Sequence, residues 1–270
     1  SVSAFLLNRS SDLEITEQAD AYFTHAVQLS DDDPGMLNDI IVKYMDNRNY
    51  DLCQKWLDRA LLLSPDSRNF IELQADLYFD TEQTDTAIEW YNHLLDEFAY
   101  DTYYWEQLGR IYYEKNDFPQ SRECFEFIEA IDPENKSARM MKASCIFSME
   151  NWEDAYKIYK ELLAEDNTSY TLLYYCGRCL YEMEQYDLAY DHFMDTLAML
   201  MLDSDVPQEM FVELYYYLSD SAFRTGNTQQ ATSFLYQGLA LDPEDDDLKK
   251  LAEQILPDRN TDIITDNKQQ

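Results

Sequence analysis

The chain has 270 residues, 46% of them hydrophobic and 14% aromatic, a composition that favours a packed core over a disordered chain. Its 54 acidic and 20 basic residues give a formal net charge of -34. That charge repels phosphate backbones and anionic lipid surfaces, so we expect no direct binding to nucleic acid or membranes, whereas basic partners are permitted. The alternative is that the charge only keeps an aromatic-rich chain soluble.

Two series of amphipathic helices alternate along the sequence. In the copy that begins near Thr102, apolar residues keep helical spacing over 105–112 and again over 118–131, with a polar turn at 115–117. The first series is predicted over residues 36–48, 68–80, 102–115, 136–149, 170–183 and 209–225. The second series is predicted over residues 13–29, 50–63, 84–97, 118–131, 152–165, 186–202 and 228–241.

Small and bulky residues recur in these helices with a fixed step of about 34 residues. Small or apolar residues of the second helices stand at Ala19, Cys53, Ala87, Ser121, Ala155, Ala189 and, after a longer gap, Ala231. Bulky residues follow four places later at Phe23, Leu57, Tyr91, Phe125, Tyr159, Phe193 and Leu235. The first helices carry small residues at Ala75, Gly109, Ala143, Gly177 and Ser219. This period predicts a solenoid in which each unit buries its apolar face against its neighbours.

One stretch carries a family resemblance, through Trp105, Leu108, Gly109, Tyr112, Ser121, Phe125 and Pro133. Their order resembles the signature of the tetratricopeptide repeat, and the resemblance extends over roughly residues 13 to 245. It implies an all-α, right-handed superhelical solenoid of about seven helix pairs with a C-terminal capping helix. It also implies a noncatalytic scaffold that binds other proteins.

The period defines one predicted domain, residues 1–256. Its units are expected near residues 1–33, 34–67, 68–101, 102–135, 136–169, 170–211 and 212–245, with a cap at 246–256 and a disordered tail at 257–270. The first unit is degenerate, which would leave its N-terminal face exposed. An insertion of about eight residues in the sixth unit lengthens a second helix through 197–202. It serves either core packing or a projecting contact surface.

No set of residues has the spacing of a catalytic or metal site. Cys176 and Cys179 form a lone CxxC within one helix and are interpreted as core residues, while His25, His93 and His192 have no metal partner at i, i+4. The acidic runs 31–33 and 244–247 precede helices and are expected to cap them rather than to bind calcium. We therefore predict no enzyme activity, no metal and no organic cofactor. Five scattered cysteines indicate a reducing compartment, and a cytoplasmic location is expected; because the sequence does not begin with Met, an exported form stays open.

The resemblance implies that the first helices line a groove for a partner. One register position, here called the aromatic ladder, reads Met45, Phe79, Tyr113, Phe147, Tyr181 and Phe223. Nearby groove positions hold Glu72, Asp76, Asp80, Glu106, Arg110, Met140, Tyr174, Arg178 and Tyr216. The alternative for the ladder is packing between neighbouring first helices.

Charged residues on the same helices indicate which kind of partner could bind. Three carboxylates, Glu72, Asp76 and Asp80, stand at i, i+4 and i+8, where their repulsion destabilises a helix, so they favour a cationic partner. Ion pairs are expected for Arg110 with Glu114, Arg178 with Glu182 and Asp220 with Arg224. The Lys and Asn clamp by which some family members hold a terminal carboxylate is absent.

The predicted function is a scaffold that binds an extended or helical protein segment, basic and partly apolar, in the groove. Two alternatives are kept. The first is a structural module that self-associates or continues a larger complex through its N-terminal face. The second is an acidic chaperone of the secretion type.

Overall fold

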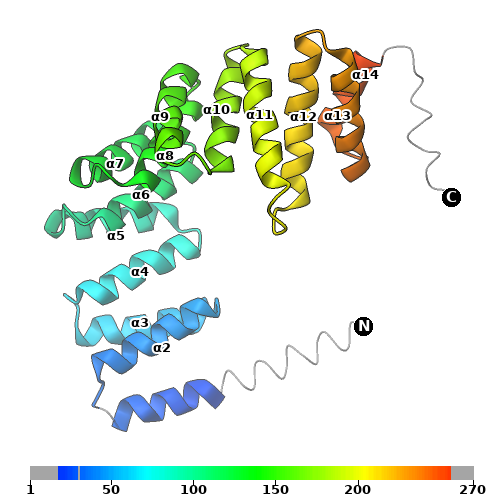
Figure 1. Ribbon diagram of the computed structural model, residues 1–270. Helices are drawn as coiled ribbons and strands as arrows, with labels where there is room; N and C mark the ends of the chain where they lie inside the picture. Colours follow the sequence, from blue (N-terminus) through cyan, green and yellow to red (C-terminus); the bar gives the residue numbers. More distant parts are fainter. Residues whose placement is uncertain (1–17, 30, 257–270) are drawn as a thin grey trace, which may run out of the picture. The chain divides into compact units, whose positions relative to one another are not determined.

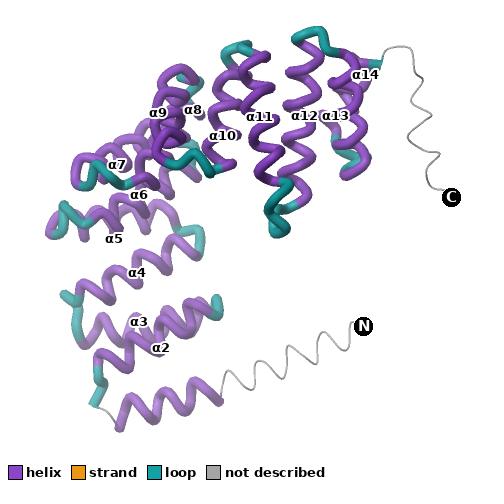
Figure 2. Tube along the Cα trace, in the orientation of Figure 1, coloured by secondary structure: helices purple, strands orange, loops and turns teal. Residues whose placement is uncertain are grey.

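The computed structural model describes residues 18–29 and 31–256. These residues form helices joined by short loops, and they contain no strand (Figure 2). Within these ranges no helix has both the length and the apolar character needed to cross a bilayer. The all-helical fold is thus confirmed, whereas residues 13–17 of the helix predicted over 13–29 and the predicted tail 257–270 fall outside the described residues.

The chain divides after Lys115 into two compact units. The first contains helical residues 18–29, α2 (Pro34–Asp46), α3 (Tyr50–Leu63), α4 (Arg68–Asp80), α5 (Thr84–Glu97) and α6 (Thr102–Glu114). The second contains α7 (Phe118–Ile131), α8 (Lys136–Ser148), α9 (Trp152–Glu165), α10 (Tyr170–Glu182), α11 (Tyr186–Leu200), α12 (Gln208–Arg224), α13 (Thr228–Leu241) and α14 (Asp246–Ile255). In the second unit α10 to α13 pack side by side in chain order (Figure 1). The single domain of seven repeats stays a prediction.

The predicted helix bounds agree with the structure to within two residues where they can be compared. The helix predicted to begin at residue 36 begins instead at Pro34, because Asp33 caps it: its carboxylate accepts the Met36 N–H at 2.9 Å. Asp245 caps α14 in the same way, accepting the Leu248 N–H at 2.8 Å. The prediction that both acidic runs cap helices is therefore confirmed.

The core consists of the residues that recur with the repeat. From α3 onward the small and bulky residues of the second helices are all buried, and so are the small residues of the first helices. The two helices of a repeat approach closely there: the Ser219 hydroxyl donates to the Ala231 carbonyl at 2.8 Å, and the Cys53 thiol lies 3.8 Å from the Ile41 carbonyl oxygen. Small side chains at these crossings allow the bulky side chains to fill the space between helices.

The turn between the two helices of a repeat places one residue in the left-handed region each time. These residues are Arg48, Glu82, Asn116, Glu150, Glu184 and Gly226, with φ between 55° and 83°. Only Asn116 and Gly226 are residue types that favour this conformation. The recurring turn is therefore not visible as a glycine pattern in the sequence.

The inserted residues lengthen mainly the first helix α12, whereas the sequence predicted that they lengthen the second helix α11. The second helix α11 ends at Leu200 and has 15 residues, only one more than α9. The first helix α12 has 17 residues where α10 has 13, so most of the added helix lies at the start of α12. The predicted extension through Leu202 is wrong, because Met201 and Leu202 are 71% and 89% exposed and leave the helix in a turn.

Candidate functional site

The predicted acidic residues of α4 are hydrogen-bonded within the first unit. Glu72 accepts a hydrogen bond from the Tyr104 hydroxyl at 3.0 Å. Asp76 accepts hydrogen bonds from the hydroxyls of Tyr91 and Tyr103, the latter at 2.9 Å. Burial is the main cause that raises the pKa of both carboxyls. Two of the three predicted carboxylates thus serve as internal acceptors, and their role toward a cationic partner stays a prediction.

Phe79 and Arg110 of the first unit lie together. The Arg110 guanidinium carbon is 5.6 Å from the centre of the Phe79 ring, and Nη1 donates to Gln107 Oε1 at 3.4 Å. Arg110 therefore contacts the ladder rather than forming the ion pair predicted with Glu114. Of the other predicted residues in this unit, Asp80 and Glu106 are exposed, and Met45 and Tyr113 are half-buried.

In the second unit the predicted residues of α8 and α10 meet two residues of α12 around one guanidinium. The Arg178 guanidinium carbon lies 5.5 Å from the Phe147 ring centre and 4.5 Å from that of Tyr217. Its Nη1 donates to the Tyr174 hydroxyl at 3.0 Å and to Glu213 Oε1 at 3.2 Å. We call these five residues the Arg178 cluster.

The electrostatics of this cluster keep the guanidinium charged although its side chain is only 19% exposed. Burial by itself would lower the pKa of Arg178, but the neighbouring tyrosines and Glu213 outweigh it and raise the pKa. The predicted ion pair with Glu182 is present at 3.7 Å. Burial raises the pKa of Tyr217 to about 12, so its hydroxyl stays protonated at neutral pH.

A second polar contact involves the ladder residue Tyr181. Its hydroxyl donates to Asp220 Oδ2 at 2.6 Å, and Asp220 forms the predicted ion pair with Arg224 at 3.3 Å. Of the remaining predicted residues, Met140, Tyr216 and Phe223 are half-buried, and each packs against a hydrophobic core of the second unit. Each ladder residue is half-buried, so the ladder is part of the packing as well as of the surface.

Sequence reasoning missed the residues near the start of each first helix. Tyr103 contacts Asp76 of the preceding first helix, and Glu213 contacts Arg178 in the same manner. Tyr103 and Glu213 occupy the same place in the repeat once the insertion is taken into account. When first helices stack, the beginning of one first helix lies against the middle of the preceding first helix. The period of the repeat could therefore have identified Tyr103 and Glu213.

Cys176 and Cys179 are fully buried free thiols in one hydrophobic core. Burial raises the pKa of each to about 12, so neither is a thiolate at neutral pH. Among the described residues no group of three or more His, Cys, Asp or Glu is arranged to hold a metal ion. The CxxC thus has the environment of core packing.

The chain resembles known proteins in part of its sequence and in its fold. A family model described as anaphase-promoting complex, cyclosome, subunit 3 matches residues 124–196. No curated protein matches the sequence. One similar solved structure is PilF of Pseudomonas aeruginosa, with a TM-score of 0.63 and 14% identity over 83% of this chain and 98% of that chain.

Two further structures are similar. The C-terminal part of a TPR repeat-containing protein from Cytophaga hutchinsonii has a TM-score of 0.71 and 16% identity, covering 87% of this chain and 93% of that one. YrrB, described as a TPR protein with an unusual peptide-binding site, has a TM-score of 0.59 and 16% identity, covering 73% and 97%. At these identities the likeness concerns the fold. The expected resemblance is confirmed at that level: this chain has the fold of the tetratricopeptide-repeat proteins.

Proposed function

We propose that this protein is a noncatalytic scaffold whose first helices bind an extended or helical segment of another protein. The observation that carries the proposal is that aromatic rings and guanidinium groups lie against one another on these helices, as Phe79 does with Arg110 and Phe147 with Arg178. Tyr and Arg are enriched among residues that dominate binding energies. A side chain fixed before binding loses less entropy when a partner arrives.

The chemistry of these side chains defines the kind of partner. Half-buried rings offer apolar contact, and the exposed carboxylates Asp80 and Glu106 attract positive charge. A segment that is basic and partly apolar therefore fits best.

The five free, buried cysteines support a reducing compartment, and we propose a cytoplasmic location for the protein.

The test uses Phe79→Ala with Arg110→Ala in one variant and Phe147→Ala in another. Phe127→Ala is the control, because Phe127 lies on the second helix α7 and is 51% exposed. Proteins captured from the source cells by the wild type are identified, and the affinity of the purified partner is then measured for each variant. We expect losses of more than about 1 kcal/mol for each strong contact, with the control unchanged. Equal affinity for all variants, at unchanged helicity, would reject the first-helix surface.

Self-association is the alternative that one observation favours. Tyr22 and Leu29, both in helical residues 18–29, are each 75% exposed. Apolar groups of this size, exposed on one helix, could contact a second copy. Sedimentation over a wide concentration range separates the two functions, because a strict monomer would remove the assembly hypothesis.

A further inference from the structure

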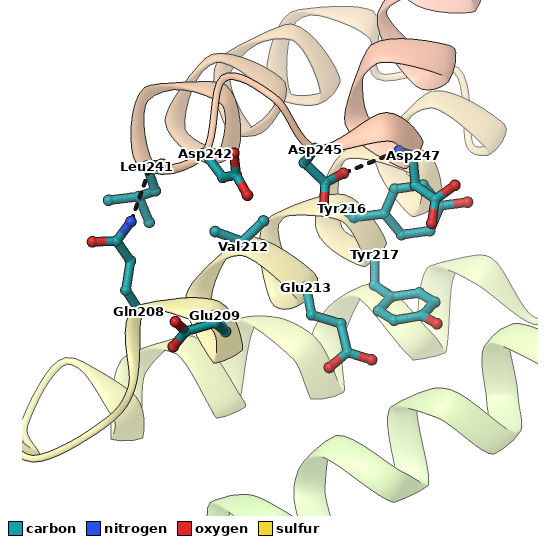
Figure 3. Close-up of a pocket in the computed structure, with 10 residues that line it drawn as sticks. All are labelled: Gln208, Glu209, Val212, Glu213, Tyr216, Tyr217, Leu241, Asp242, Asp245 and Asp247. Atoms are coloured by element: carbon teal, nitrogen blue, oxygen red, sulfur yellow. Dashed lines mark hydrogen bonds between the residues drawn. The ribbon is translucent and has the colours of Figure 1, made fainter. Parts of the chain in front are cut away.

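A pocket of about 550 Å³ lies in the second unit, between α12 and the turn that joins α13 to α14 (Figure 3). Its volume falls within the roughly 300–1,000 Å³ of pockets that hold ligands. In Figure 3 the side chain of Val212 on α12 points toward Asp242 in the turn, and Glu209 and Glu213 line the α12 side of the pocket. Of its lining, only Tyr216 belongs to the predicted groove.

The inserted turn of α12 forms one end of this pocket. In the register of α10 the first helix would begin at Val212, but α12 begins at Gln208. The added turn supplies Gln208 and Glu209 to the lining. Gln208 Nε2 donates to the Leu241 carbonyl at 2.8 Å, which ties the added turn to the end of α13. The insertion thus provides a wall that a regular repeat lacks.

The chemistry of the lining is acidic around an apolar and aromatic surface. Val212, Leu241 and the rings of Tyr216 and Tyr217 form the apolar part, and the two rings meet edge to face with centres 5.2 Å apart. Five carboxylates line the pocket, and no Lys or Arg is among its lining residues. The lining therefore favours a cation that also carries apolar groups.

Three of the five carboxylates already have partners. Asp245 caps α14, Glu213 pairs with Arg178, and Asp247 pairs with a lysine of its own helix at 2.9 Å. Glu209 and Asp242 take part in no ion pair within residues 18–29 and 31–256; Asp242 accepts a backbone N–H from two residues further on at 2.9 Å, and its charge is one of the causes that raise the pKa of Lys249. These two carboxylates are available for a cation from outside.

We propose that this pocket binds the side chain of a lysine or arginine on a partner protein. The alkyl stem lies along the rings of Tyr216 and Tyr217, and the cationic head reaches Glu209 and Asp242. A metal ion fits less well, because the described carboxylates are not grouped closely enough to hold one. The inference rests on the proposed function only in that the occupant is a protein segment.

The probe is a fluorescein-labelled peptide with one central arginine among Ala, Leu and Gln, compared with the same peptide carrying neutral citrulline. Fluorescence anisotropy with the full chain is expected to give at least about tenfold tighter binding of the arginine peptide. In the variant Glu209→Gln/Asp242→Asn the two peptides should bind alike. If that double variant folds poorly, Glu209→Gln alone is used, since Glu209 is exposed in the first turn of α12.

The matched control is Asp166→Asn/Asp187→Asn, which also removes two negative charges, but at residues that do not line the pocket. Asp166 directly follows α9 and accepts the backbone N–H of the residue two places further on, as Asp242 does directly after α13. Asp187 lies in the first turn of α11, as Glu209 does in α12. The control should keep the preference for arginine.

Three results would overturn the pocket proposal: equal binding of both peptides by the wild type, equal losses in both double variants, or no binding of the arginine peptide at about 1 mM. The second result would assign the attraction to the net charge of the whole chain. None of them bears on Phe147→Ala in the partner assay, so failure of the pocket and failure of the proposed function are distinguished.

Discussion

Replacing Gly177 with alanine tests the close approach of α10 to α11. A Cβ atom at this position would lie 2.7 Å and 2.8 Å from two ring carbons of Phe193. That ring is fully buried and stacks on Tyr217 with centres 5.3 Å apart, so it cannot move without disturbing the Arg178 cluster. Alanine gains about 1 kcal/mol of helix propensity, whereas overpacking costs about 1–3 kcal/mol. We expect a net loss of about 1 kcal/mol in the free energy of unfolding.

Gly238→Ala is the matched substitution: its Cβ would lie 2.7 Å and 3.2 Å from the two methyl carbons of Leu248 and 3.3 Å from Tyr215 Cβ, so the closest atoms belong to the end of a flexible aliphatic side chain rather than to a rigid ring. There we expect a smaller loss than for Gly177→Ala. Urea denaturation followed by circular dichroism measures both variants, and equal slopes against urea confirm that the same surface unfolds. Adding Phe193→Leu should reduce the loss caused by Gly177→Ala, with a coupling of at least about 0.5 kcal/mol. A Gly177→Ala protein as stable as the wild type would refute the steric reasoning.

Three other predictions concern buried groups and a helix cap. Because burial raises the pKa of Asp76 above its ordinary value of 3.8, the folded state holds the Asp76 proton more tightly than the unfolded state does, so the part of the stability that depends on Asp76 should rise as the pH falls through the folded-state pKa toward 3.8. Asp76→Asn, which keeps an acceptor for Tyr91 and Tyr103, should flatten that dependence in urea titrations; an unchanged slope would contradict it. Cys176 should react with a thiol reagent only as the protein unfolds, and rapid labelling of the native protein would reject its core role. Asp245→Ala should destabilise α14 by about 1 kcal/mol, seen as faster hydrogen exchange confined to residues 246–255; protection equal to the wild type would show that the cap contributes little.

The fold was predictable because the physical requirement recurs in the sequence. A helix crossing needs a small residue and a bulky neighbour each time, and the chain repeats both, as at Ala189 with Phe193. The distribution of the insertion was not predictable in this way. Apolar residues continue through Met201 and Leu202, but Leu200 already completes the buried stripe, so the chain turns there and the added length goes to α12. The hydrophobic pattern alone does not determine which of two adjoining helices is lengthened by an insertion.

The candidate site was predictable only in part, because contacts between stacked helices depend on two register positions at once. The aromatic ladder predicted Phe147 as a site residue. Arg178 was predicted because it lies at a groove position of a first helix, and the structure places it beside Phe147. Glu213 required the further step that the start of a first helix reaches the middle of the one before it. The same step explains why Tyr103 reaches Asp76 in the first unit. Side chains at the start of each first helix are therefore where a substitution should alter both the stacking of repeats and the surface offered to a partner.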